Sequence, residues 1–429
     1  MSILITIMKR RSFIKGMTAA GAASLLPIGA ASSILQGCKG TSPSPGWDFD
    51  EVIDRSGTWS IKESRAGEGR IPMWIADMDF RTDPAVREAL RERIDRDVLG
   101  YTHTPEEFYE AIRAWEGSQF GWDIPREWVG YTPGVITGIC QAFMAFSEPG
   151  DKIIVQPPVY DHFRMYAERL GREVADNPMI FNGERYRMDF DGLERMMDER
   201  TKILVLCNPH NPCGILWDRE TLGRLAGICE RHGVIVISDE IHADLALYGL
   251  THIPFCSASE TAKKVGLMFG GPTKAFNLAG LSGTAFCIIP DENKRKKYLD
   301  CLKAAKLDDP SIPTIIAMIA AYSSKSGWLP ALKEYLQGNI DLVMDFFGKH
   351  RLGISPIRPE ASFLVWMDCR ETGLPQDALL ERFREKAGVY LSDGAAYGKG
   401  GEGFVRLNIG CPRSILSEAL ERIRGAFQA

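Results

Sequence analysis

Short apolar segments alternate with amphipathic helical segments through the middle of this chain of 429 residues. Strands are expected at 152–155, 202–207, 234–238, 265–269 and 284–289, and helices at 84–98, 134–146 and 219–231. Because parallel strands need helical crossovers between them, this alternation predicts an α/β fold with a doubly wound, mostly parallel sheet in a large domain. Ligands of such folds bind at the carboxyl ends of the strands.

The rest of the chain predicts a smaller C-terminal α/β domain. Helical patterns over about 310–350 precede strands near 362–367 and 403–409 and a final helix from Ser414. We expect the large domain to span 81–325 and the smaller domain 326–429. The arm at 47–80 is expected to pack on the smaller domain or on a partner subunit. A composition that is 45% hydrophobic and 25% charged suits a large core divided between two domains.

Three polar motifs follow three of the expected strands. They are NPHNPCG at 208–214, SDEIH at 238–242 and PTKAFNLAG at 272–280. Each has an ordinary explanation alone, since Asn-Pro is first a turn signal and lysines are common. Together they place an amide, an acid and a lysine at neighbouring strand ends, which is the set that a pyridoxal 5'-phosphate site requires. The combination predicts a pyridoxal-dependent enzyme of amino acids.

Each motif then receives a candidate role. Lys274 provides the amine that forms a Schiff base with the cofactor aldehyde, which requires a removable charge. Asp239 pairs with the protonated pyridine nitrogen. Asn211 and His242 provide neutral donors to the phenolic oxygen of the cofactor, although His242 is equally well explained as a satisfied core histidine. Asn208 is assigned to the turn.

A phosphate site is expected where YTPGVITG at 131–138 opens a helix. Free backbone NH groups at Val135 and Ile136 face the phosphate in this interpretation, and such a terminus contributes about 0.3 to 1 kcal/mol toward an anion. An ordinary helix start is the alternative. Thr273 is a second candidate phosphate contact or a turn residue beside proline. Tyr160 is expected to stack on the pyridine ring, or to be a core tyrosine.

Arg406 is the one charged residue in the strand-like segment FVRLNIG at 404–410. The planar guanidinium matches a carboxylate in two parallel hydrogen bonds, which suits the α-carboxylate of an amino-acid substrate. An internal ion pair is the competing explanation, because a buried arginine must have a partner.

The chain resembles the fold-type I pyridoxal enzymes of the aminotransferase class I/II superfamily, and within them the MalY/PatB-type cystathionine beta-lyases. The resemblance covers nearly everything after the leader, with motifs WIADMDF at 74–80, GYT at 100–102, PVYD at 158–161, HGVIVISDEIH at 232–242, KAFNLAGL at 274–281 and RLNIGCPR at 406–413. It implies a PLP-dependent transferase-like fold and the same roles for Lys274, Asp239, Asn211, His242, Tyr160 and Arg406. It also implies a homodimer in which Tyr101 reaches the phosphate of the neighbouring subunit.

The implied activity is α,β-elimination on L-cystathionine or other cysteine S-conjugates, giving pyruvate, ammonia and a thiol. Residue types alone leave an aminotransferase open as an alternative, and a non-catalytic ligand-binding lipoprotein is a second one. The sequence departs from the family at Cys213, where threonine or serine is usual, and at the pair Gly270 and Gly271, where relatives often carry a hydroxyl. Many aminotransferases also have an arginine where Ser282 stands, and its absence fits the lyase branch.

The first 37 residues resemble a twin-arginine lipoprotein signal. KRRSFIK at 9–15 precedes an Ala/Gly-rich stretch at 17–35, and LQGC at 35–38 has the form of a lipobox that ends at Cys38. A membrane-spanning helix and a disordered basic tail are the alternatives, and Met8 is a possible start. We expect lipidation at Cys38, a linker at 38–46, and a protein held on the periplasmic or cell-surface side by its lipid alone.

Charge and cysteine content exclude several classes of protein. Residues 1–37 contain four basic and no acidic residues, so their removal shifts the net charge from -5 to -5 - 4 = -9. An acidic chain of this kind is not expected to bind nucleic acid. Of ten cysteines, nine remain after Cys38, without paired metal-ligand spacing, so we expect buried free thiols and no metal site.

Overall fold

The computed structural model describes residues 46–428. The twin-arginine signal, Cys38 and all of the linker except its last residue lie outside this range, and their assignments stay predictions. Within the described range, no helix combines the length and the apolarity that crossing a bilayer requires.

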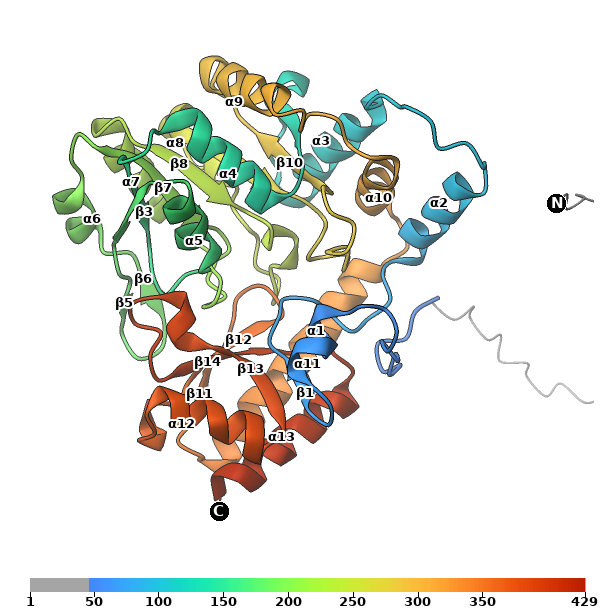
Figure 1. The fold of residues 1–429 in the computed structure, drawn as a ribbon, viewed down its shortest axis with the longest axis vertical. Coiled ribbons are helices and arrows are strands. Elements are labelled where there is room, and N and C mark those ends of the chain that lie inside the picture. The colour runs from blue at the N-terminus through green and yellow to red at the C-terminus, as the bar shows by residue number, and fades with distance from the viewer. Residues whose placement is uncertain (1–45, 429) are drawn as a thin grey trace, which may run out of the picture. The chain divides into compact units, whose positions relative to one another are not determined.

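The larger of two main sheets has seven strands in the order β2-β10-β9-β8-β7-β3-β4 (Figure 1). All neighbours are parallel except β10, which is antiparallel to both β2 and β9. The strands are β2 (Val129–Thr132), β3 (Lys152–Val155), β4 (Glu173–Asp176), β7 (Thr201–Cys207), β8 (Ile235–Asp239), β9 (Gly266–Gly270) and β10 (Ala285–Ile288). The predicted doubly wound, mostly parallel sheet is therefore confirmed.

Both faces of this sheet are covered by helices, which is why its strands read as nearly continuous apolar runs. Alternate residues point to opposite faces, so Ile153 and Val155 join one core and Ile154 joins the other. The first core includes α4 (Val135–Phe146), α5 (His162–Arg169) and α9 (Glu292–Ala304). The second includes α3 (Glu106–Phe120), α7 (Arg219–Arg231) and α10 (Ile312–Ser323). Further helices in this part of the chain are α2 (Pro84–Ile94), α6 (Phe190–Met196) and α8 (Glu260–Val265).

The smaller sheet has the order β1-β13-β14-β12-β11. Its strands are β1 (Ile71–Met73), β11 (Ser355–Ile357), β12 (Leu364–Asp368), β13 (Val389–Asp393) and β14 (Phe404–Asn408), with α1 (Ile61–Ala66), α11 (Trp328–His350), α12 (Gln376–Glu381), the wide helical turn η5 (Arg382–Lys386) and α13 (Arg413–Gln428) around them. A separate hairpin joins β5 (Ile180–Phe181) and β6 (Tyr186–Arg187). The N-terminal arm joins this sheet, because β1 pairs in parallel with β13 (Figure 1).

Two helix boundaries differ from the prediction. The helix expected over 84–98 ends at Ile94, because Asp97 adopts a left-handed φ of 60° that a right-handed helix cannot continue through. The helical stretch expected over about 310–350 is two helices, and Gly327 with φ 82° separates them at the start of α11.

Candidate active site

A cavity of about 740 Å³ opens at the carboxyl ends of β7, β8 and β9 and is closed on its other side by β13 and β14. We call it the strand-end cavity. Its walls include Asn211, Asp239 and Lys274, which come from the three predicted motifs, and Arg406 from β14. The parallel strands bring Asn211, Asp239 and Lys274 together because the carboxyl ends of these strands meet at one edge of the larger sheet.

Lys274 lies in the loop after β9, and its Nζ donates to the carbonyl oxygen of Ala76 at 2.8 Å. Burial of the ammonium, assisted by the nearby cation of Arg406, lowers the pKa of Lys274 to about 8, against weaker opposing effects of Asp77 and Asp239. A neutral amine is therefore accessible near neutral pH, which an amine that attacks a carbonyl carbon requires.

Asp239 is the last residue of β8 and is 4% exposed. Its Oδ1 accepts a hydrogen bond from the backbone NH of Ile241 at 3.1 Å. Burial raises the pKa of Asp239 to about 7, which the Ile241 NH and the charge of Lys274 oppose. A buried carboxylate with so few donors is stabilised by any cation that enters the cavity beside it.

Arg406 projects from β14 and is also 4% exposed. Its Nη1 donates to Oδ1 of Asn211 at 2.8 Å, and its Nη2 donates to the Trp74 carbonyl at 2.7 Å. The Nε of Arg406 has no partner, and no carboxylate lies within 4.0 Å of the guanidinium, among the described residues. The internal ion pair considered above is thus not present in this part of the chain, and the guanidinium remains available to a ligand.

His242 lines the same cavity and is 3% exposed. Its Nδ1 is 3.0 Å from Oγ of Ser362, and burial lowers the pKa of His242 well below its usual value. The ring is therefore neutral at physiological pH. It is both a packed residue of the core and a wall of the cavity.

The start of α4 forms another wall. Gly134 caps this helix with φ 106° and without a side-chain hydrogen bond, and Val135 and Ile136 follow it along the cavity. The first NH groups of a helix have no partner within it, so this terminus favours an anion. Thr273 and Tyr160 also line the cavity.

Some predicted residues lie elsewhere. Tyr101 is fully exposed in the segment between α2 and α3 and does not line the cavity. Asn208 donates from Nδ2 to the Ile253 carbonyl at 3.0 Å, which ties its turn to the next loop. The thiol of Cys213 is buried in the core. Ser282, by contrast, lies on the cavity wall.

Several other wall residues were not predicted from the sequence. Ser392 and Tyr390 come from β13, Arg65 comes from α1, and Arg384 comes from η5. Trp74, Ile75 and Ala76 also line the cavity and stand in one of the motifs on which the resemblance was based. These residues reach the cavity through the pairing of β1 with β13, which joins segments more than 300 residues apart.

Metal and disulfide chemistry find no support in residues 46–428. No group of three or more metal-ligating side chains occurs there, and the nine cysteines of this range are free thiols.

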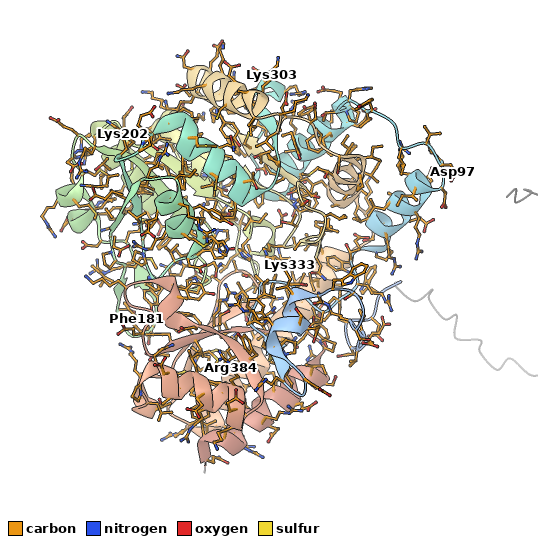
Figure 2. All side chains as sticks on the ribbon, in the orientation of Figure 1. Asp97, Phe181, Lys202, Lys303, Lys333 and Arg384 are labelled. Atoms are coloured by element: carbon orange, nitrogen blue, oxygen red, sulfur yellow. The ribbon has the colours of Figure 1, made fainter. Side chains whose placement is uncertain are left out.

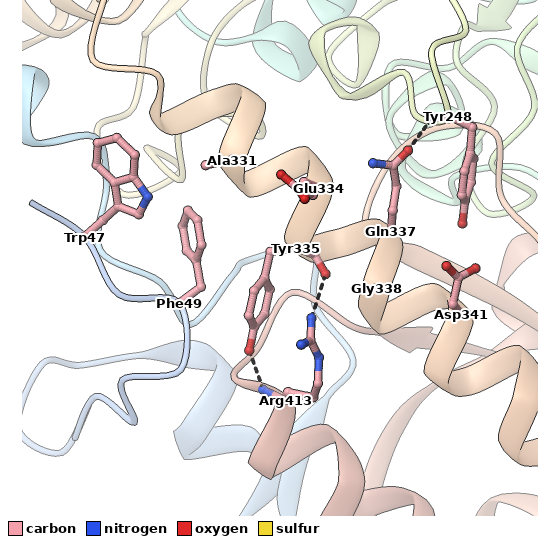
Figure 3. Close-up of a pocket in the computed structure, with 10 residues that line it drawn as sticks. All are labelled: Trp47, Phe49, Tyr248, Ala331, Glu334, Tyr335, Gln337, Gly338, Asp341 and Arg413. Carbon is pink, nitrogen blue, oxygen red and sulfur yellow. Dashed lines mark hydrogen bonds between the residues drawn. The ribbon is translucent and has the colours of Figure 1, made fainter. Parts of the chain in front are cut away.

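A second hollow of about 700 Å³ lies between the arm and α11, and we call it the arm groove (Figure 3). Trp47 and Phe49 line it from the arm, and Tyr335 and Gln337 line it from α11. Several of its polar groups bind one another: the Arg413 backbone NH donates to the Tyr335 hydroxyl at 2.7 Å, and the Tyr248 NH donates to Oε1 of Gln337 at 2.6 Å. No predicted site residue lies in this groove.

The fold and the strand-end cavity define an α/β protein in which a desolvated lysine, a buried acid and an arginine that pairs with no carboxylate of the described residues surround one ligand site. The family model for aminotransferase class I and II matches residues 71–423. The chain belongs to this family.

Individual relatives are similar over most of the chain. Cystathionine beta-lyase PatB of Bacillus subtilis (strain 168) is 40% identical, and the alignment covers 89% of this chain and 100% of that protein. Protein MalY of Escherichia coli (strain K12) is 35% identical, with 89% and 99% covered. The crystal structure of cystalysin from Treponema denticola, which contains pyridoxal 5'-phosphate, matches with a TM-score of 0.86 at 30% identity, covering 89% and 99%.

Proposed function

We propose that this protein is a pyridoxal 5'-phosphate-dependent carbon-sulfur β-lyase. It acts on L-cystathionine or other cysteine S-conjugates and releases pyruvate, ammonia and a thiol. The buried guanidinium of Arg406, which pairs with no carboxylate of residues 46–428, together with the desolvated amine of Lys274 in the same cavity, is the observation that carries the proposal. The similarity to PatB and MalY supports elimination over transamination.

The residues of the strand-end cavity fit pyridoxal phosphate. The Asp239 carboxyl, with its pKa raised to about 7 by burial, is satisfied by a protonated ring nitrogen. The uncapped start of α4 at Val135 and Ile136 suits the phosphate, with Thr273 beside it. Asn211 and the neutral ring of His242 suit the phenolic oxygen, and Tyr160 suits the ring face. When bound, the cofactor withdraws electrons from the α-carbon of the amino acid.

Lys274 has two tasks in this proposal. Its amine holds the cofactor covalently in the resting enzyme, and once a substrate has displaced it, the same amine takes the proton from the substrate α-carbon. The lowered pKa of Lys274 serves both tasks, because each needs the uncharged amine.

Arg406 binds the α-carboxylate of the substrate. Arg406 lines the cavity, and its Nε has no partner among the described residues, so the guanidinium has donor capacity left for a carboxylate, while Asn211 and the Trp74 carbonyl fix its plane. This contact orients the bond from the α-carbon to its proton toward Lys274.

The functional unit in this proposal is a homodimer in which the partner subunit's Tyr101 completes the phosphate site. The full exposure of the aromatic ring of Tyr101 supports an intermolecular role. The oligomeric state is measured by sedimentation velocity of the loaded wild type and of the loaded Tyr101→Ala variant. A monomeric, fully active wild type contradicts a shared site.

Substrate turnover decides between the lyase and its alternatives. The purified protein, loaded with pyridoxal phosphate, is incubated with L-cystathionine with and without a keto-acid acceptor. We expect pyruvate release that does not require the acceptor. Acceptor-dependent amino transfer without pyruvate identifies an aminotransferase instead, and no turnover of any amino acid favours a binding lipoprotein.

Export is a separate part of the proposal and rests on sequence alone. The twin-arginine pattern and the lipobox support a lipid anchor at Cys38 on the periplasmic or cell-surface side. A route for folded proteins allows the cofactor to be loaded in the cytoplasm. Membrane fractionation of the full chain tests it: Cys38→Ala should release the protein, and an unlipidated N-terminus in the wild type contradicts the anchor.

A further inference from the structure

The solvent-facing side of the strand-end cavity carries two arginines that the proposed chemistry does not use. Arg65 stands in the last turn of α1, and Arg384, labelled in Figure 2, stands in η5. Arg65 is exposed and Arg384 is half-buried, whereas Arg406 lies deeper in the same cavity. The cavity thus has a second cationic region nearer to solvent.

Aromatic rings hold both guanidinium groups in place. The guanidinium carbon of Arg65 lies 4.9 Å from the ring centroid of Trp74, and that of Arg384 lies 4.6 Å from the centroid of Tyr390. The two rings contact each other edge to face, with centroids 5.9 Å apart at 72°. Stacking uses the plane of a guanidinium and leaves its NH edge free to donate.

No protein group uses these donors. Within residues 46–428, neither guanidinium makes a hydrogen bond or an ion pair to a protein group; the contact of Arg384 with Arg70 uses the backbone carbonyl of Arg384. Acids close by in the chain are engaged elsewhere: Glu385 pairs with Arg70 at 2.7 Å, and Asp393 accepts from Gln376 at 2.6 Å. Asp161, Asp239 and Asp393 also line the cavity, but none of them forms an ion pair with either arginine. Two oriented cations that no carboxylate of the described residues pairs with favour an anionic ligand group.

We infer that Arg384, assisted by Arg65, binds a carboxylate on the sulfur substituent of the substrate. The inference rests on the proposed function, in which Arg406 already takes the α-carboxylate. The second carboxylate must then belong to the part that leaves as the thiol. The preferred substrates are therefore cysteine S-conjugates with an acidic leaving group, rather than neutral S-alkyl cysteines.

Two conjugates of similar length test this preference, namely S-(2-carboxyethyl)-L-cysteine and S-propyl-L-cysteine. The loaded wild type should favour the acidic conjugate by about tenfold or more in kcat/KM, which corresponds to about 1.4 kcal/mol. In Arg384→Gln this ratio should fall toward one, mainly through KM of the acidic conjugate. Arg65→Gln should lower the ratio less than Arg384→Gln does, and Arg384→Lys should keep part of the preference. Lys386→Gln is the matched control, because Lys386 is an exposed cation of the same turn that does not line the cavity.

The dependence of KM on ionic strength is a second test, because a purely structural role of Arg384 would not change it. Raising ionic strength should increase KM of the wild type for the acidic conjugate more than for the neutral one, and Arg384→Gln should remove that difference. A wild-type ratio near one, or a ratio unchanged in Arg384→Gln, overturns the inference while pyruvate release still supports a β-lyase. Absence of pyruvate from both conjugates overturns the proposed function and this inference together.

Discussion

The strand-end cavity and the arm groove have similar volumes, about 740 and 700 Å³, but opposite chemistry. In the groove, Tyr335, Gln337 and Arg413 bind neighbouring protein groups (Figure 3). In the cavity, Arg406 keeps a free Nε, and burial shifts the pKa of Asp239 and Lys274 toward neutrality. Polar groups that the protein leaves unsatisfied, rather than volume, therefore mark the ligand site.

The largest expected loss of activity follows from replacing Lys274. Lys274→Ala should lower kcat/KM by about four orders of magnitude or more, because it removes both the covalent attachment and the base. Pyruvate release measures the loss, and circular dichroism confirms the fold. Lys333→Ala, on the α11 side of the molecule, is the control. Substantial turnover in Lys274→Ala contradicts the assignment of the reaction to the strand-end cavity.

Asp239 should give the cofactor-free protein a pH-dependent stability. Its folded pKa, about 7, lies above the unfolded value of 3.8, so between these pH values the native state holds a proton that the unfolded chain releases. The stability that this group contributes is full below pH 3.8 and falls by about 4 kcal/mol as pH rises to 7. Urea unfolding from pH 4 to 7 should show this slope in the wild type. Equal slopes in wild type and Asp239→Asn contradict it.

Arg406 lines the strand-end cavity and Arg413 lines the arm groove, so the same arginine-to-glutamine substitution can be compared in the two hollows. Arg406→Gln should cost about 2 to 3 kcal/mol of substrate binding, or roughly 30- to 150-fold in kcat/KM, because it removes a buried charged donor. The loss should fall mainly on KM. Comparable activity of wild type and Arg406→Gln on L-cystathionine shows that another group binds the α-carboxylate.

Arg413→Gln should have the smallest effect. Arg413 donates to Oδ1 of Asn339 at 3.2 Å and stacks on Tyr335, so its loss should lower the free energy of unfolding by about 1 kcal/mol. Activity should stay within about twofold of the wild type, because the groove holds no reacting group. If Arg413→Gln loses as much kcat/KM as Arg406→Gln, the arm groove also takes part in catalysis, which contradicts the distinction between the two hollows.

The large sheet was predicted well from the sequence, because most of its strands are apolar runs that can be recognised from neighbouring residues alone. β3 begins and ends at the predicted residues 152 and 155, and Lys274 and Asp239 were found from their places beside apolar runs. The smaller sheet was predicted only in part. Its pairing of Ile71 with Val389 depends on contacts across the chain that no local pattern encodes. Arg65 and Arg384 were missed for the same reason, since each resembles a solvated surface arginine until the fold brings them to one cavity.

Borohydride trapping of the loaded protein, followed by peptide mass spectrometry, tests the central assignment most directly. Reduction converts the covalent attachment of the cofactor into a stable mark on the lysine that carries it. We predict a single pyridoxyl mark on Lys274 and none in Lys274→Ala. A mark on another lysine, or no mark in correctly folded and loaded protein, contradicts the assignment.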